Sequence, residues 1–189
     1  MFIVFENRSY GAVVGKSSAP FLNRTLIPGC GLATNYHNYS HPSTPNYLAL
    51  TSGTAQAKAV SVDCNPAGCP LSQDSIFSQL GNAGQAWREY AEAMPANCDK
   101  KNYDNIAYVN ADGSTGEYYY VRHAPPPYYT SSPVPGECAS WDVPLGTRSS
   151  GSFPNALSPA ATGCRRSASS PPADATTCTT APPAWETTG

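Results

Sequence analysis

The composition of the chain changes near Thr147, and this change limits how much of the sequence can fold. Alanine, proline, serine and threonine make up 29 of the 43 residues from Thr147 to Gly189, and the large apolar residues there are Phe153, Leu157 and Trp185. These few apolar side chains cannot bury enough surface to offset the entropy lost when the chain becomes ordered. We therefore expect this stretch to be disordered. The alternative is a Pro/Thr-rich linker, or the stalk of a surface protein. In either case a folded domain is expected in the part that precedes it.

Charge and hydropathy exclude two classes of protein. Charged residues make up 13% of the chain and the net charge is −2, so a basic nucleic-acid-binding surface is not expected. The mean hydropathy is −0.37, and no apolar run reaches the length of about 18 residues that predicts a membrane span. Residues 1–6 are too short for a signal peptide and lack its basic region and cleavage site.

The seven cysteines are an odd number, so at least one lacks a partner within the chain. Cys64 and Cys69 bracket a turn-rich Asn-Pro-Ala-Gly loop and could close a small ring. Cys98 and Cys138 flank a stretch rich in Tyr, Pro and Gly that a disulfide could tie down. A zinc site is less favoured, because there is no C-x-x-C motif and only three histidines. Disulfides indicate an oxidising compartment, so we expect a secreted or extracytoplasmic protein whose signal peptide is absent from this chain.

Apolar patterning predicts strands and helices that alternate along the first 90 residues. Strands are expected at residues 2–5, 31–36 and 85–90, and helices at residues 19–26, from 45 to 50, and 74–80 with an end at Gly81 or Gly84. Residues 91–146 are interpreted as rich in loops. This order of elements predicts an α/β sandwich with a largely parallel sheet.

Glu6 and Asn7 come directly after the first predicted strand. Ligands of open α/β sheets bind at the carboxyl ends of the strands. A carboxylate beside a carboxamide offers two oxygen donors to a divalent cation. The alternative for this pair is an ordinary turn, which asparagine often begins.

The segment from Asn38 to Asn46 carries a second candidate site. Pro45 fits the first position of a helix, which makes Thr44 its N-cap and places Ser43 just before the cap. A hydroxyl group there lies at the positive end of the helix dipole, where free N–H groups can hold a phosphate. Serine becomes a better nucleophile when a bound cation lowers its pKa. The alternative is an ordinary Ser/Thr cap without chemistry.

Four longer segments occur in order: E-N-R-S-Y from Glu6, S-A-P-F-L-N from Ser18, A-T-N-Y from Ala33 and H-P-S-T-P-N-Y-L-A-L-T-S-G from His41. Shorter pieces follow them: Asp63-Cys64, Cys69-Pro70-Leu71, Trp87-Arg88-Glu89-Tyr90, Met94-Pro95 and Val121-Arg122-His123. Together they resemble the phosphoesterase family, which contains acid phosphatases and phosphatidylcholine-type phospholipases C of the alkaline-phosphatase-like superfamily. The match covers residues 2–157 and is greatest with the acid-phosphatase branch.

The resemblance implies an alkaline-phosphatase-like three-layer sandwich, here incomplete, that hydrolyses phosphate monoesters through a phosphoserine intermediate. Ser43 would be the nucleophile, with Thr44 as the fallback. Glu6, Asn7 and Ser43 would hold a divalent metal ion. Polar positions near the phosphate would be Asn38, His41, Asn46 and His123, although the two histidines could equally be structural. A small phosphate ester would be the substrate.

The resemblance also assigns the cysteines. Cys64–Cys69 and Cys98–Cys138 would be the family's disulfides, and Cys30 would be a small buried residue. Three N-x-S/T sequons begin at Asn7, Asn23 and Asn38. They are interpreted as coincidental, because a glycan on Asn7 would block metal binding. Two rival functions stay open: a phospholipase C, and a non-catalytic secreted fragment or binding module.

The family continues through segments resembling L-P-A-F-x-F-V-T-P and N-D-M-H-D, which this chain lacks after Leu157. Read one base out of register, codons for residues 176–181 permit Asn-Asp-Met-His-Asp-Gly, and those for residues 163–172 permit Leu-Pro-Ala-Phe-Arg-Phe-Val-Thr-Pro. We therefore expect residues 1–157 to be the N-terminal part of a phosphoesterase domain and residues 158–189 to be a frameshifted, disordered tail. Because metal ligands and sheet strands would then be missing, we expect weak stability and little or no turnover.

Overall fold

The computed structural model describes residues 1–54, 61–109, 115–131, 136–147 and 151–157. The chain divides into two compact units, Met1–Asn38 and Tyr39–Gly189, and each is described by itself. Disorder was expected from Thr147 onward, but residues Ser152–Leu157 form a helix whose Phe153 packs on Tyr90, so that expectation is wrong for this part. The tail at residues 158–189 lies outside the described residues. Its frameshift and its disorder therefore stay predictions.

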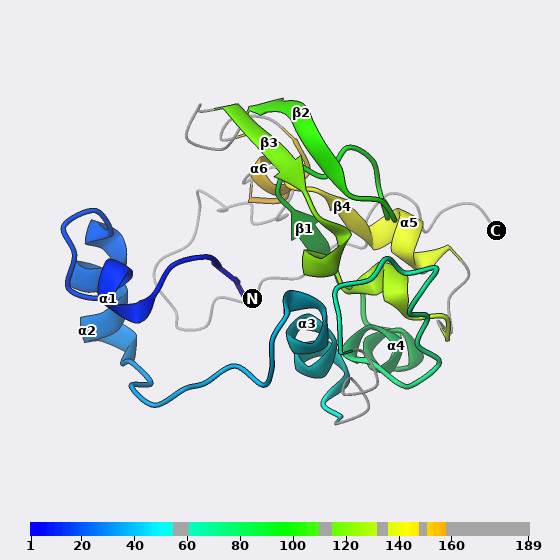
Figure 1. Ribbon diagram of the computed structural model, residues 1–189, viewed down its shortest axis with the longest axis horizontal. Coiled ribbons are helices and arrows are strands. Elements are labelled where there is room, and N and C mark those ends of the chain that lie inside the picture. Colours follow the sequence, from blue (N-terminus) through cyan, green and yellow to red (C-terminus); the bar gives the residue numbers. More distant parts are fainter. Residues whose placement is uncertain (55–60, 110–114, 132–135, 148–150, 158–189) are drawn as a thin grey trace, which may run out of the picture. The chain divides into compact units, whose positions relative to one another are not determined.

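The first unit contains three short helical segments: α1 (Tyr10–Val13), the π-helix η1 (Leu22–Leu26) and α2 (Ile27–Cys30) (Figure 1). The backbone is helical from residue 20 through residue 26, so the helix expected at residues 19–26 is confirmed. The strands expected at residues 2–5 and 31–36 are wrong, because neither segment is a strand in the structure. A strand needs a partner for its backbone hydrogen bonds, and the four apolar side chains of residues 2–5 are 46% to 89% exposed.

Asn23 closes the turn between α1 and η1. Its Nδ2 donates to the carbonyl oxygens of Val13, Lys16 and Ala19 at 2.9, 3.0 and 2.9 Å. Its Oδ1 accepts from the backbone N–H of Gly15 at 2.6 Å. Gly15 has a φ of 75°, a left-handed conformation that glycine adopts without steric cost. The Asn23 side chain thus forms hydrogen bonds to backbone groups of this turn that do not pair with one another.

Cys30 is exposed and makes no disulfide, so the expectation of a small buried residue is wrong. It is the last residue of α2 and precedes Gly31, which turns the chain at a φ of 93°. Cys30 therefore stands at the end of a short helix in which the structure buries no residue.

The second unit holds the longer helices. Its helical segments are α3 (Ser43–Ser52), α4 (Ile76–Asn82), η3 (Val121–His123), η4 (Pro126–Tyr128), α5 (Glu137–Trp141) and α6 (Ser152–Leu157). The helices expected near residues 45–50 and 74–80 are confirmed as α3 and α4. At α4 the Ser75 side chain accepts from the N–H of Ser78 at 3.2 Å, and the Ser78 hydroxyl accepts from the N–H of Ser75 at 2.9 Å. This reciprocal capping box defines where α4 begins.

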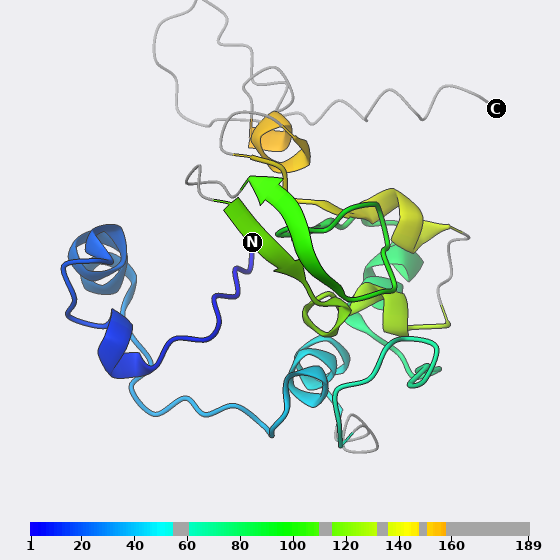
Figure 2. The same ribbon diagram turned by 45° about the horizontal axis from the view of Figure 1, so that its top comes forward.

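Two small sheets accompany these helices. Strand β1 (Glu89–Ala91) pairs in parallel with β4 (Asp142–Pro144), and β2 (Tyr103–Val109) pairs antiparallel with β3 (Thr115–Tyr119). The hairpin of β2 and β3 is visible in both ribbon views (Figure 1, Figure 2). The expectation that residues 91–146 are rich in loops misses this hairpin. Mixed helices with a small parallel sheet are consistent with an α/β fold, and the described residues do not form a three-layer sandwich.

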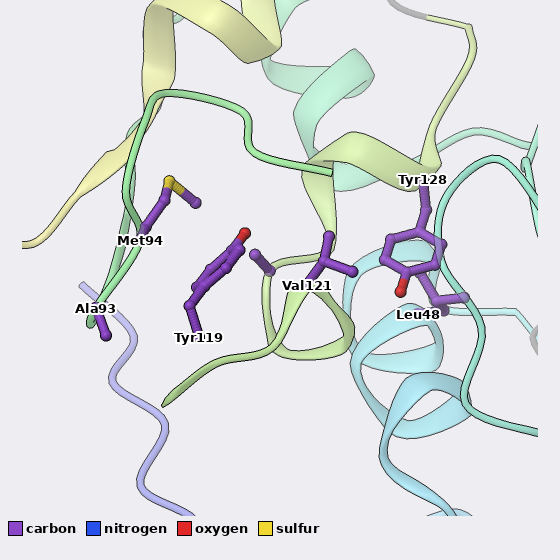
Figure 3. Packing of buried hydrophobic residues seen from close by; sticks show 7 residues of the cluster. Leu48, Ala93, Met94, Tyr119, Val121 and Tyr128 are labelled. Atoms are coloured by element: carbon purple, nitrogen blue, oxygen red, sulfur yellow. The ribbon is translucent and has the colours of Figure 1, made fainter. Parts of the chain in front are cut away.

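The core of the second unit lies between α3 and the β3–η3–η4 segment. Seven buried residues form one cluster: Leu48, Ala93, Met94, Tyr119, Val121, Ala124 and Tyr128. Figure 3 shows Val121 between Tyr119 on one side and Leu48 with Tyr128 on the other. Leu48 of α3 and Tyr128 of η4 have no exposed surface. This packing fixes one face of α3, and therefore the position of its first turn within the unit.

The structure links Cys64 to Cys69 and Cys98 to Cys138, with Cα–Cα distances of 6.2 and 5.4 Å. These are the pairs that the resemblance implied. The first closes a ring of a few residues, and the second ties the loop after β1 to α5. No helix in the described part of the chain is long and apolar enough to cross a membrane.

Candidate functional site

The first turn of α3 carries the predicted nucleophile. The helix begins at Ser43, which makes Thr44 its second and Pro45 its third residue. The expected start, with Thr44 as the N-cap, is therefore wrong by two positions. The N-cap is Pro42, whose side chain makes no capping hydrogen bond. Proline is tolerated at the third position because the first N–H groups of a helix have no partner within it.

A carboxylate from a distant part of the chain caps this turn instead. Asp63 Oδ1 accepts from the backbone N–H of Thr44 and from the Thr44 hydroxyl, both at 3.0 Å. Thr44 has no exposed surface, so water cannot replace these bonds. A negative charge at the N-terminus of a helix is stabilised by the helix dipole. The positive end of α3 therefore holds an anionic group of the protein itself.

Arg122 of η3 balances the charge of Asp63. Its Nε lies 3.4 Å from Asp63 Oδ2, and its guanidinium carbon lies 3.9 Å above the centre of the Tyr120 ring. The two side chains of the ion pair keep 26% and 34% of their surface exposed. Stacking on an aromatic ring restricts a guanidinium group that would otherwise move freely. A cation is thus held beside the first turn of α3.

His123 follows Arg122 and lies against α3. Its ring centre is 5.3 Å from that of Tyr47 on α3 and 6.0 Å from that of Tyr120. These ring contacts bring His123 to the helix that carries Ser43. His123, one of the four side chains predicted to lie near the phosphate, thus packs on α3 from another segment.

The other predicted polar residues of the second unit have different surroundings. Asn46 donates through Nδ2 to the carbonyl oxygens of Ser40 and Pro42 at 2.7 and 2.9 Å, and its Oδ1 accepts from the Ser40 N–H at 2.8 Å. The Asn46 amide therefore holds the loop before α3 in place. His41 lies in that loop and is exposed.

The two hydroxyl groups proposed as nucleophile differ in how far they are buried. Ser43 is half-buried, and no described residue hydrogen-bonds its side chain. Thr44 is fully buried, and its proton is donated to Asp63. A substrate has to reach the attacking oxygen, so this geometry favours Ser43 over Thr44.

Tyr128 lies beneath the capped turn. The pKa of Tyr128 is raised to about 12, mainly by burial; Asp63 also raises it, and Thr44 and Arg122 lower it. The phenol keeps its proton at neutral pH and donates it to the carbonyl oxygen of Cys64. The residue after Asp63 is thereby tied to the core.

Glu6, Asn7 and Asn38 belong to the first unit, whereas Ser43 belongs to the second. Asn7 has a φ of 58°, a left-handed conformation that asparagine tolerates better than most residues. The two units are described separately, so the joint metal site of Glu6, Asn7 and Ser43 stays a prediction.

A second group of acidic side chains lies away from α3. Glu89 and Asp142 are opposite one another in the parallel β1–β4 pair. Glu89 Oε2 and Asp142 Oδ1 are buried without a hydrogen-bond partner. Burial raises the pKa of Asp142 to about 7, with repulsion from Asp99 adding to the rise. Burial, and then repulsion from Asp142, raises the pKa of Glu89 well above its ordinary value.

Asp142 also lies close to the sulfurs of Cys98 and Cys138. Those two sulfurs are joined in a disulfide, and metal ligation by cysteine requires a thiolate. Of Cys98, Cys138 and Asp142, only the Asp142 carboxylate could therefore bind a cation. This group is not an alternative to the predicted metal ligands.

Sequence reasoning missed Asp63 and Arg122 as parts of the site. Both were noted only as pieces of the family resemblance. Their pairing depends on a contact between segments far apart in the chain, which no local pattern reports. The available signal was their position, because Asp63 directly precedes the Cys64–Cys69 ring and Arg122 directly precedes a candidate histidine.

The sequence model of the Phosphoesterase family matches residues 15–137, and the chain belongs to this family. The match includes the Ser43 turn, Asp63, Arg122 and His123.

Two known sequences are similar to the chain. A phosphatidylinositol-3-phosphatase of Mycobacterium tuberculosis is 34% identical over 99 residues, which cover 51% of this chain and 31% of that protein. A probable acid phosphatase of Kluyveromyces lactis is 34% identical over 126 residues, which cover 66% of this chain and 27% of that protein. The chain therefore spans less than a third of the length of these two relatives. No solved structure matches the chain.

Proposed function

We propose that the chain carries the nucleophile-bearing part of an acid-phosphatase-like enzyme that hydrolyses phosphate monoesters, with Ser43 as the attacking residue. The observation that supports this most is the first turn of α3. A half-buried serine stands at the N-terminus of a helix, beside a cation held by stacking and an ion pair. The family and the two phosphatase relatives support the same class of reaction.

In this proposal the Ser43 oxygen attacks phosphorus, and the bond from phosphorus to the leaving alcohol oxygen breaks. The alcohol leaves with a proton, and the serine hydroxyl loses one, so a phosphoserine remains. Water then attacks the phosphoserine, releases inorganic phosphate and returns a proton to Ser43. Arg122 would attract the phosphate oxygens, and His41 or His123 would carry protons at the edge of the site.

The predicted metal ligands are Glu6, Asn7 and Ser43. They offer a carboxylate, an amide and a hydroxyl oxygen, a donor set that suits a hard or borderline divalent cation. When bound, such a cation would lower the pKa of the hydroxyl group and stabilise charge on the phosphoryl group. Three donors are fewer than the six or so that such cations take. We therefore expect weak metal binding and slow turnover by this chain.

Three further features belong to the proposal. The described residues would form part of an alkaline-phosphatase-like sandwich spanning residues 1–157. The protein would be secreted or extracytoplasmic, which is compatible with its two disulfides. A phospholipase C remains the rival in the same family, and a non-catalytic binding module is the rival outside it.

The experiment compares the full chain with Ser43→Ala and Ser72→Ala, with and without divalent cations. Ser72 is exposed and lies outside the site, so its variant is the matched control. Hydrolysis of p-nitrophenyl phosphate, a diester analogue and phosphatidylcholine vesicles is measured. Acid-quenched protein is digested, and the peptide that contains Ser43 is examined for added phosphate by mass spectrometry.

We expect monoester hydrolysis and phosphate on Ser43, both lost in Ser43→Ala and kept in Ser72→Ala. Release from the lipid alone would favour the phospholipase. Retention of labelling in Ser43→Ala and its loss in Thr44→Val would move the nucleophile to Thr44. A chain that binds no cation and takes up no phosphate would be the non-catalytic module.

A further inference from the structure

We infer that Asp63 is a positioning residue for Ser43, and that the Cys64–Cys69 disulfide holds Asp63 in place for this role. The inference rests on the proposed function, because it assumes that Ser43 is the nucleophile. It adds a residue that acts on the reaction without touching the substrate.

The first step is that α3 has no cap of its own. The residue before the helix is Pro42, which has no side chain that accepts a hydrogen bond. The N–H groups of a first turn need partners from outside the helix. Asp63, 19 residues further along the chain, provides one by accepting from the N–H of Thr44 at 3.0 Å.

The second step is that one oxygen atom binds both the backbone and the side chain of Thr44. Asp63 Oδ1 accepts from the backbone and from the hydroxyl of Thr44. The rotation of the Thr44 side chain and the path of its backbone are therefore set together. Ser43 is the preceding residue, so its orientation follows from the geometry of Thr44.

The third step is that Asp63 is itself anchored. Cys64 joins Cys69 in a disulfide, and the N–H groups of Gly68 and Cys69 both donate to the Asn65 carbonyl oxygen, at 2.9 and 3.2 Å. The Tyr128 hydroxyl donates to the carbonyl oxygen of Cys64. A small cross-linked ring thus presents Asp63 to α3, with the buried Tyr128 fixing the ring to the core.

The fourth step concerns charge. A carboxylate near an incoming phosphate would repel it if nothing compensated its charge. The ion pair of Asp63 with Arg122 at 3.4 Å provides that compensation. Asp63 can therefore order the turn while leaving the local charge close to neutral.

The test uses the full chain with Asp63→Ala, Asp63→Asn and the matched control Asp74→Ala. Asp74 caps α4 in a similar way, accepting from the Ser75 N–H at 3.0 Å and from Gln79 Nε2 at 2.9 Å. The measurements are the rate of phosphate incorporation on Ser43 over a range of p-nitrophenyl phosphate concentrations, and hydrogen exchange at the Thr44 amide.

In Asp63→Ala we expect the limiting rate of Ser43 phosphorylation to fall about 10- to 100-fold, the loss typical of a displaced reacting group. The substrate concentration at half-maximal rate should change by less than about twofold. Exchange at Thr44 should become about 10- to 100-fold faster, because a bond to a charged acceptor is lost. Asp63→Asn keeps an acceptor oxygen and should restore most of both losses. Exchange at Leu48 in the core shows whether each variant has folded.

Asp63→Ala that is phosphorylated at the wild-type rate would overturn the inference, as would a loss of the same size in Asp74→Ala. A change confined to the half-maximal concentration would also overturn it, because it would make Asp63 a binding residue. Absence of phosphate on Ser43 in the wild-type chain is a separate result, because it defeats the proposed function before any variant is compared.

Discussion

Replacing Asp142 with asparagine tests whether a buried carboxyl group makes this protein more stable in acid. Asp142 has no exposed surface and lies opposite Glu89 in the β1–β4 pair. Among the side chains that the structure describes, no lysine, arginine or histidine forms an ion pair with either acid. Other groups near Asp142 are Asp99, Tyr119 and the Cys98–Cys138 disulfide. Ionisation of Asp142 therefore places an uncompensated charge in the interior.

The size of the effect follows from the pKa. Burial raises the pKa of Asp142 from 3.8 to about 7. The folded protein then holds this proton more tightly than the unfolded chain does, so the free energy of unfolding falls as the pH rises between the two values. A difference of about three pKa units corresponds to about 4 kcal/mol, which is a large part of the stability of a typical domain. Burial, and then repulsion from Asp142, raises the pKa of Glu89 in the same direction.

The assay is urea unfolding between about pH 4.5 and pH 8.5, followed by tryptophan fluorescence. For a typical slope of about 2 kcal/mol per molar urea, the wild-type midpoint should fall by up to about 2 M across this range. Asp142→Asn cannot ionise at this position, whereas the buried Glu89 still can. The midpoint of this variant should therefore fall less steeply than that of the wild type and exceed it at pH 8.

The control is Asp74→Asn, which changes an exposed carboxyl group. Hydrogen bonds from Ser78 and Gln79 lower the pKa of Asp74. The stability that Asp74 contributes is lost only as the pH falls below its unfolded value. This variant should therefore keep the wild-type decrease between pH 5 and pH 8. A wild-type midpoint that is flat or rises in that range, or an Asp142→Asn midpoint that falls as steeply, would refute the reasoning.

Three further changes test the packing of the second unit by the same unfolding measurement. Leu48→Ala removes a fully buried side chain from the core and should cost about 2–5 kcal/mol; a loss below about 1 kcal/mol would contradict the observed core. Replacing Cys98 and Cys138 together by serine opens a disulfide with a sequence separation of 40 and should cost about 4 kcal/mol, if the effect is that of loop closure in the unfolded chain. Tyr128→Phe leaves the Cys64 carbonyl without its donor and should cost about 1–3 kcal/mol. The Tyr128→Phe variant should also lose less stability above pH 10, because burial raises the pKa of the phenol to about 12 and the folded state holds that proton more tightly.

Local patterns were enough to predict two helices of the second unit, α3 and α4. Pro45 and the apolar residues after it indicated α3, and Ile76, Phe77 and Leu80 indicated α4. These signals work because a helix forms its hydrogen bonds within one segment, so its ends and its apolar face are written in neighbouring residues.

Strands and site contacts were harder to predict, because each depends on a partner elsewhere. Residues 2–5 have the composition of a buried strand, yet they form none in the structure. The β2–β3 hairpin was not predicted, because residues 91–146 were interpreted as rich in loops. A helix near Ser43 was predicted, but its start was expected two residues too late, and the link from Thr44 through Asp63 to Arg122 needed the fold. The joint site of Glu6 and Asn7 with Ser43 stays a prediction.

The hydrogen bonds of Asn23 have a consequence for how the protein is produced. Asn23-Arg24-Thr25 is an acceptor sequence for N-linked glycans. A sugar attached to Nδ2 would replace one of the two hydrogens that this nitrogen donates to Val13, Lys16 and Ala19. It would also place a bulky group inside the turn. A host that attaches a glycan to Asn23 would therefore yield molecules with a disrupted turn in the first unit, whereas a host without this modification would leave the turn intact.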